Sequence, residues 1–83
     1  MHEYSLVQAM FDQIGLVVRA RGAISVRRVR VRMGQFAGVD PELFRTAYEV
    51  FRLNTMCADA PLEIEQGAAD DELLLEQVEL EVP

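Results

Sequence analysis

The sequence predicts a small α+β fold in which two helices pack on one face of a three-stranded, mostly antiparallel sheet, in the order α-β-α-β-β. Three observations support this fold class. Apolar residues recur at helical spacing in two segments, and they alternate with polar residues in three others. The length of 83 residues suffices for one domain only, which we assign to residues 1–83.

The first helix is expected over residues 5–20. Ser5 and Gln8 have the spacing of a capping box, in which each side chain reaches the backbone amide of the other residue. Gly22 can end the helix in a left-handed conformation. One apolar stripe recurs at helical spacing along this segment: Leu6, Met10, Ile14, Val17 and Val18.

The first strand is expected over residues 23–35, because apolar and arginine side chains alternate along most of this segment. The alternation changes phase between Val26 and Val29. A one-residue change of phase turns every later side chain to the other face, so it predicts a bulge near Arg27 and Arg28.

The second helix is expected over residues 41–53. Asp40 is a favourable N-cap residue, and Pro41 suits the first helical position because its missing N–H is not needed there. Helical spacing predicts that five side chains of this segment face the core: Leu43, Phe44, Ala47, Val50 and Phe51.

The two remaining strands are expected over residues 62–65 and from Leu74 onward. Glu76 breaks the apolar alternation of the last strand, so its start is expected to be exposed. Only residues 66–71 join the two strands, and this short connection predicts a hairpin.

The composition excludes several classes of protein. A net charge of -6 and a pI near 4.6 disfavour nucleic acid and anionic membranes as partners. No apolar run approaches the roughly 20 residues that a membrane-spanning helix needs, and we expect no signal peptide. The single cysteine, Cys57, excludes an internal disulfide and suits the cytoplasm.

One basic cluster stands out, and it is formed by Arg27, Arg28, Arg30 and Arg32. The glutamate-rich strands offer opposite charges across the sheet, so we interpret the cluster as a solvated, cross-paired face. A docking surface is the alternative. A nucleic-acid-binding domain ranks far behind both, because no aromatic side chain is interleaved with the arginines.

The remaining candidate residues favour structural roles. Cys57 follows Met56 in a loop and is interpreted as a partly buried thiol rather than as a soft metal ligand. Tyr48 and Phe51 are interpreted as core residues. The sequence shows no Ser-His-Asp or Cys-His arrangement and no glycine-rich phosphate loop, so we predict that the protein is not an enzyme.

The N-terminus carries the strongest functional signal, because the only histidine is His2. The α-amine of Met1, the His2 amide nitrogen and the His2 imidazole are nitrogen donors at fixed spacing. They close a five-membered and a six-membered chelate ring, which favours square-planar or tetragonal Ni(II) or Cu(II). Met1 is expected to remain in place, because His2 is too bulky for removal of the preceding methionine. A frayed terminus is the alternative interpretation.

Two segments carry a family resemblance. The opening residues 1–6 read MHEYSL, and residues 29–42 read VRVRMGQFAGVDPE. These motifs resemble those of the HypA/HybF family of nickel metallochaperones, which act in [NiFe]-hydrogenase maturation. Further similarity in the same order covers nearly the whole chain: Phe44, residues 47–50, 61–65 and 74–81.

The resemblance implies a zinc module of two Cys-x-x-Cys pairs between the last two strands, near residues 66–72. One cysteine cannot build a site of four thiolates, so no structural zinc is expected. The chain is then either a zinc-less relative or a chain from which the module was excised. The short connection also suggests a dimer formed by exchange of strands between two copies.

The resemblance implies that Met1, His2 and Glu3 bind nickel, with Glu3 supplying its amide nitrogen or orienting the site. It further implies delivery of Ni(II) during maturation of hydrogenase, or of urease, with a HypB-type GTPase and the hydrogenase large subunit as partners. A metal-free interaction module that docks on maturation proteins is the alternative hypothesis.

Overall fold

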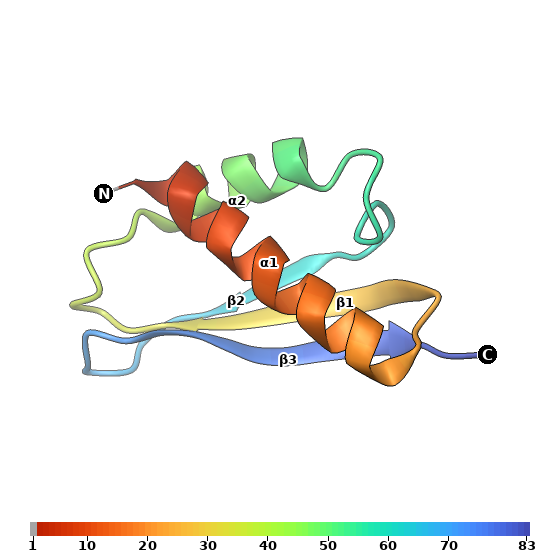
Figure 1. The fold of residues 1–83 in the computed structure, drawn as a ribbon. Helices are drawn as coiled ribbons and strands as arrows, with labels where there is room; N and C mark the ends of the chain where they lie inside the picture. Colours follow the sequence, from red (N-terminus) through yellow and green to blue (C-terminus); the bar gives the residue numbers. More distant parts are fainter. Residues whose placement is uncertain (1) are drawn as a thin grey trace.

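The computed structural model describes residues 2–83 and confirms the predicted α+β fold class (Figure 1). Two helices cover one face of a three-stranded sheet and leave the other face open. Along the chain the elements are α1 (Glu3–Arg21), β1 (Ser25–Met33), α2 (Pro41–Phe51), β2 (Leu62–Glu65) and β3 (Leu73–Glu81). Neither helix is both long enough and apolar enough to cross a membrane.

The sheet is mixed and has the order β2-β1-β3. β1 is central, pairing parallel with β2 and antiparallel with β3. The predicted hairpin of the last two strands is therefore wrong, because β2 and β3 lie on opposite sides of β1. The reason is that α2 forms the crossover between β1 and β2, and a strand that follows a helical crossover pairs parallel with the strand before it.

The pairing of β1 with β3 contains two irregularities. The first lies between Val26 and Arg28 and confirms the predicted bulge. The second lies between Arg30 and Val31, where the partner strand passes from Gln77 to Leu75. The skipped residue on β3 is Glu76, whose break in apolar alternation is explained by this bulge.

α1 begins two residues earlier than the sequence predicted. Glu3 is its first residue and His2 is the N-cap, without a side-chain hydrogen bond. The carbonyl of His2 accepts a hydrogen bond from the Leu6 N–H at 3.0 Å. Ser5 therefore lies inside the helix, and the expected capping box is wrong. At the other end Gly22 takes the predicted left-handed conformation, with φ 61°.

α2 begins as the sequence predicted, because the Asp40 carboxylate accepts hydrogen bonds from the N–H groups of Glu42 and Leu43 at 2.9 and 3.2 Å. The helix ends at Phe51 rather than near Leu53. Its predicted core face is partly wrong, since Leu43 and Val50 are 51% and 55% exposed. The core side is centred instead on three buried residues: Phe44, Ala47 and Tyr48.

The core lies between the helical layer and the sheet. Val29, Val31 and Met33 project from β1 toward the helices and are buried. They meet the buried stripe of α1 formed by Val7, Met10, Ile14 and Val18. The predicted stripe is confirmed at Met10, Ile14 and Val18, whereas Leu6 and Val17 lie at its borders.

The open face of the sheet carries the arginines of β1 between acidic side chains. Arg28 pairs with Glu63 on β2 and with Glu79 on β3, at 3.6 and 4.0 Å. Arg30 pairs with Glu65 and Glu76 at 2.5 and 3.4 Å, and Arg32 pairs with Asp70. The interpretation of the basic cluster as a cross-paired face is thereby confirmed for these three arginines.

Candidate metal centre at the N-terminus

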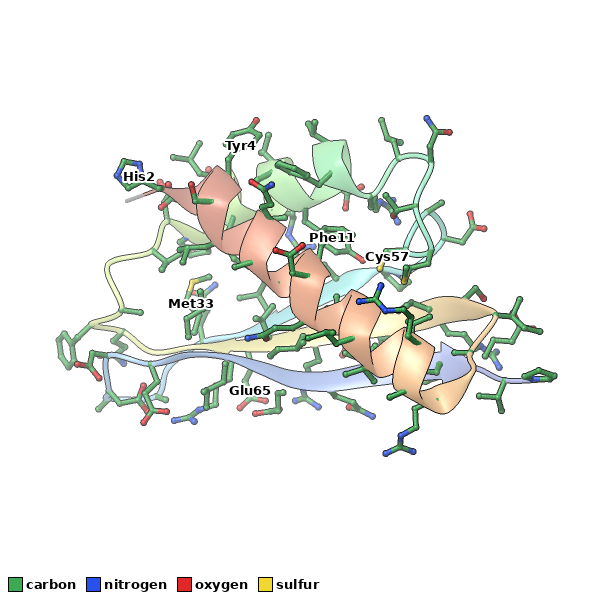
Figure 2. The ribbon with its side chains drawn as sticks, in the orientation of Figure 1. His2, Tyr4, Phe11, Met33, Cys57 and Glu65 are labelled. Atoms are coloured by element: carbon green, nitrogen blue, oxygen red, sulfur yellow. The ribbon has the colours of Figure 1, made fainter. Side chains whose placement is uncertain are left out.

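His2 lies directly before the first turn of α1, and its side chain is exposed. Figure 2 shows the imidazole projecting away from the helical layer into solvent. The α-amine predicted as its chelate partner belongs to Met1, which lies outside the described residues. An imidazole in this position is open to an incoming metal ion and to a protein that carries one.

Glu3 is anchored although its neighbour His2 is exposed. Among residues 2–83 it is the only charged residue that is buried, with 7% of its surface accessible. Its Oε2 accepts a hydrogen bond from the Asp40 N–H at 3.1 Å. Because Asp40 also caps α2, this contact ties the start of α1 to the start of α2. Glu3, the residue after the exposed histidine, is thus held in place by its contact with Asp40.

The Asp40 N–H also sets the charge state of Glu3. Its hydrogen bond to the carboxylate holds the pKa of Glu3 below the ordinary value. Glu3 is therefore ionised at neutral pH. The position at the start of α1 is consistent with this charge, because the positive end of a helix dipole stabilises anions.

The backbone at this terminus suits the predicted amide ligands. The first N–H groups of a helix have no carbonyl partner within the helix. The amides of His2 and Glu3 stand at this position, so their deprotonation to bind a metal breaks no hydrogen bond of the helix. The dipole that stabilises a carboxylate there also stabilises a deprotonated amide nitrogen. The carboxylate of Glu3 is already bound to Asp40, which favours an orienting role for that group.

The contact between Glu3 and Asp40 was not predicted. The sequence identified Asp40 as a helix cap, but the two residues are 37 positions apart and belong to different elements. A pattern within a few neighbouring residues cannot predict a contact between residues so far apart in the sequence. The only available signal is that both residues fall within the two segments that carry the family resemblance.

Cys57 lies at the other end of the helical layer from His2 (Figure 2). It is fully buried, more deeply than the sequence predicted, and burial raises the pKa of its thiol to about 11. The Tyr48 hydroxyl donates a hydrogen bond to the Ala60 carbonyl at 2.7 Å, and burial raises the pKa of that phenol. A buried, protonated thiol is a poor metal ligand.

The described part of the chain contains no cluster of side chains that could form a metal centre of its own. Within residues 2–83, no group of three His, Cys, Asp or Glu side chains is arranged to hold a metal ion. A closed structural zinc site needs four ligands such as thiolates and imidazoles, and the sequence has one cysteine and one histidine. The residues present therefore do not fit the zinc group that the resemblance implies.

Comparison with known proteins decides the family. The family model described as "HypA: Hydrogenase/urease nickel incorporation, metallochaperone, hypA" matches residues 1–80. The chain belongs to the HypA family. The family match includes the N-terminal residues 1–3, the loop before α2 and nearly all of β3.

Similar HypA relatives come from several bacteria. Hydrogenase maturation factor HypA of Shewanella oneidensis is 42% identical over 62 residues, which cover 75% of this chain and 52% of that protein. The HypA of Wolinella succinogenes is 40% identical over 65 residues, covering 78% of this chain and 55% of the relative. The chain thus spans about half the length of the curated HypA relatives that it matches.

Two solved structures share the fold. The solution structure of the Ni metallochaperone HypA from Helicobacter pylori aligns with a TM-score of 0.88 at 22% identity, covering 100% of both chains. A second solution structure of a HypA protein aligns with a TM-score of 0.77 at 24% identity, covering 96% of both. At these identities the agreement concerns the HypA fold alone.

Proposed function

We propose that this HypA domain binds Ni(II) at its N-terminus and acts as a metallochaperone in [NiFe]-hydrogenase or urease maturation. Family membership supports the class of function. The observation that carries the site is the exposed His2 beside the anchored Glu3. The proposed ligands are the amine of Met1, the amide and imidazole of His2, and the amide of Glu3, in a tetragonal arrangement.

The surroundings of this terminus support delivery as well as binding. A donor set on a solvent-exposed terminus can exchange its ligands one at a time with those of a better-fitting site. Each amide and imidazole donor must lose a proton to bind the metal, so affinity falls as the pH falls. Nickel is therefore a cargo here, and we assign no catalytic residue to the domain.

The partners follow from the same proposal. A HypB-type GTPase is proposed as a protein that supplies or receives nickel, and the hydrogenase large subunit as the acceptor. We propose the cytoplasm as the location of this domain, which suits its single cysteine. We further propose that the domain carries no structural zinc, in agreement with its single cysteine.

Calorimetric titration with Ni(II) tests the site. The untagged protein beginning at Met1 is compared with His2→Ala and with a protein that carries one additional N-terminal residue. His2→Ala removes the imidazole and is expected to weaken binding by at least about a hundredfold. The extension converts the amine into a peptide nitrogen and is expected to weaken binding as well. Circular dichroism should be unchanged in both, because the His2 side chain makes no cap contact.

A C-terminal extension of the same size is the control, and it should leave nickel affinity unchanged. If His2→Ala binds Ni(II) as tightly as the unaltered protein, the N-terminal assignment is wrong. If neither the unaltered protein nor any variant binds nickel, the alternative of a metal-free module that docks on maturation proteins is favoured instead.

A further inference from the structure

The outer edge of β2 is open to another strand. β2 is the terminal strand of the sheet order β2-β1-β3. The Val29 N–H donates to the Pro61 carbonyl at 3.1 Å, which fixes the residues whose backbone faces β1. Backbone groups alternate in direction along a strand, so those of Leu62 and Ile64 face away from β1.

A groove runs beside this edge, between α2 and β2. Its volume is about 610 Å³. Val50 of α2, Leu53 just after this helix and Ile64 of β2 provide apolar walls, and the carboxylates of Glu42 and Glu49 are also present. Val50 and Leu53 are more than half exposed, so these apolar walls are accessible from solvent.

The charges on the open face of the sheet specify what fits beside β2. The rows alternate in sign across the sheet: Glu76 and Glu79 on β3, then arginines on β1, then Glu63 and Glu65 on β2. Opposite charges on neighbouring strands stabilise each other, whereas like charges directly opposite are destabilising. The next row beside β2 is therefore favoured to be basic. A second copy of β2 would place glutamates against glutamates.

We propose that the groove and the open edge of β2 bind an extended polypeptide segment of a partner in which basic and apolar residues alternate. The segment pairs its backbone with Ile64. Its apolar side chains enter the groove between α2 and β2, and its basic side chains extend the charge rows next to Glu63 and Glu65. Recognition of this kind combines main-chain hydrogen bonds with pockets for alternate side chains.

Arg45 controls access to this edge. Its Nη1 donates a hydrogen bond to the Leu62 carbonyl at 2.9 Å, so the guanidinium covers part of the open side. A charged side chain at this position is a common protection against unwanted strand pairing. An incoming segment must displace Arg45 from Leu62 or pair only beyond it. Removal of this side chain should therefore tighten binding.

The other edge of the sheet fits such a segment less well. The groove beside β3 also has an acidic side chain, Glu79, but it is lined by Arg21 of α1 as well. The groove beside β2 also contains a cation, Arg45, but there α2 contributes the carboxylates of Glu42 and Glu49 as well. The helix beside β3 contributes the cation Arg21 alone, which repels a basic segment. The two edges thus carry similar acidic rows but differ in the net charge that the adjoining helix contributes, which makes β3 a control for β2.

The probe is a capped peptide of four alternating lysine and valine pairs, titrated into the full chain. Two double variants form a matched pair. Glu63 and Glu79 both contact Arg28 with 47% and 44% of their side chains exposed. Glu65 and Glu76 both contact Arg30 with 44% and 37% exposed. We expect E63Q/E65Q to weaken binding about threefold to thirtyfold. E76Q/E79Q should change it less than about twofold.

Hydrogen exchange locates the bound peptide. Exchange of the Ile64 amide should slow when the peptide binds, because the peptide backbone then accepts its hydrogen bond. R45A should bind the peptide more tightly, and a peptide with glutamate in place of lysine should not bind. The proposal is overturned if the Ile64 amide is not protected at saturation. Equal weakening in both double variants also overturns it, because that result indicates general attraction to an acidic protein.

Discussion

His2 and Cys57 are the single histidine and the single cysteine of this HypA domain, and they lie in opposite surroundings. His2 is exposed on a terminus that Glu3 anchors to the start of α2. Cys57 lies in the loop that follows α2 and is fully buried, and burial keeps its thiol protonated. The thiolate is the better ligand in free solution, yet the histidine is the residue that a metal can reach.

The difference between His2 and Cys57 shows that the accessibility of a side chain, and not only its chemical type, decides whether it can bind a metal ion. Nickel transfer requires that ligands can be exchanged, which the exposed terminus allows and the packed interior does not. The helical layer therefore has two functional parts. Its core holds the fold together, while its N-terminal edge is the part that we propose to bind nickel.

The largest expected effect tests the packed part. Phe44 is fully buried, and Phe44→Ala should lower the free energy of unfolding by about 3–5 kcal/mol. Its neighbour Leu43 is 51% exposed, so Leu43→Ala should change stability by no more than about 0.5 kcal/mol. Urea denaturation monitored by circular dichroism measures both. Similar losses in the two variants would show that the face of α2 is assigned wrongly.

The second prediction concerns the availability of the thiol. Because burial raises the pKa of Cys57 to about 11, about one thiol in a thousand is ionised at pH 8. Labelling by a disulfide reagent at pH 8 should be at least about a hundredfold slower in the folded protein than in urea. The reagent acts only when the structure opens. Rapid labelling of the folded protein would show that the Cys57 thiol is accessible, as the His2 side chain is.

The third prediction compares two glycines of the helix and loop segments. A Cβ on Gly34 would overlap the backbone carbonyl of Asp70, so Gly34→Ala should cost about 1–3 kcal/mol. A Cβ on Gly15 of α1 has Arg19 Nη1 as its nearest neighbour at 3.7 Å. Gly15→Ala should therefore stabilise the protein by about 0.5–1 kcal/mol. Thermal melting of both variants shows whether each one gains or loses stability. A change in the same direction in both would show that the space around one of these glycines is described wrongly.

The smallest expected effect concerns the anchor of the N-terminus. The pKa of Glu3 is lower in the folded protein, so its contribution to stability is present above the unfolded pKa of about 4.3. That contribution is lost as the pH falls through the lowered folded pKa. The difference in urea midpoint between the unaltered protein and Glu3→Gln should be greatest near pH 7 and should shrink below about pH 4. If the difference in urea midpoint stays constant with pH, the stabilising effect of Glu3 does not depend on the charge of its carboxylate.

Sequence patterns predicted the features that depend on local chemistry. The Asp40 and Pro41 pair marked the start of α2, Gly22 marked the end of α1, and the change of phase near Arg27 located a bulge. Each of these signals lies within a few residues of the structure that it specifies. The pairing of the β1 arginines with acidic residues was also predicted, because charge complementarity leaves a visible pattern in both partners.

The features that were missed depend on contacts between distant segments. The hairpin was wrong because a short connection suggests local pairing, whereas the crossover through α2 had already placed β2 beside β1. Helical spacing identified the apolar residues of α2 but did not show which of them lie at the centre of the buried face. Leu43 and Val50 were therefore wrongly placed in the core. For the candidate metal site, the sequence named Met1, His2 and Glu3 but did not predict the contact between Glu3 and Asp40.

The position of β1 between the other two strands has a consequence for how the family can vary. The connection from β2 to β3 passes across the end of β1 and contributes no residue to the sheet. Both strands take their register from β1, not from each other. The entropy of closing such a loop grows only slowly with its length. We therefore expect that residues inserted within positions 66–72 leave the pairing of β2 and β3 with β1 unchanged.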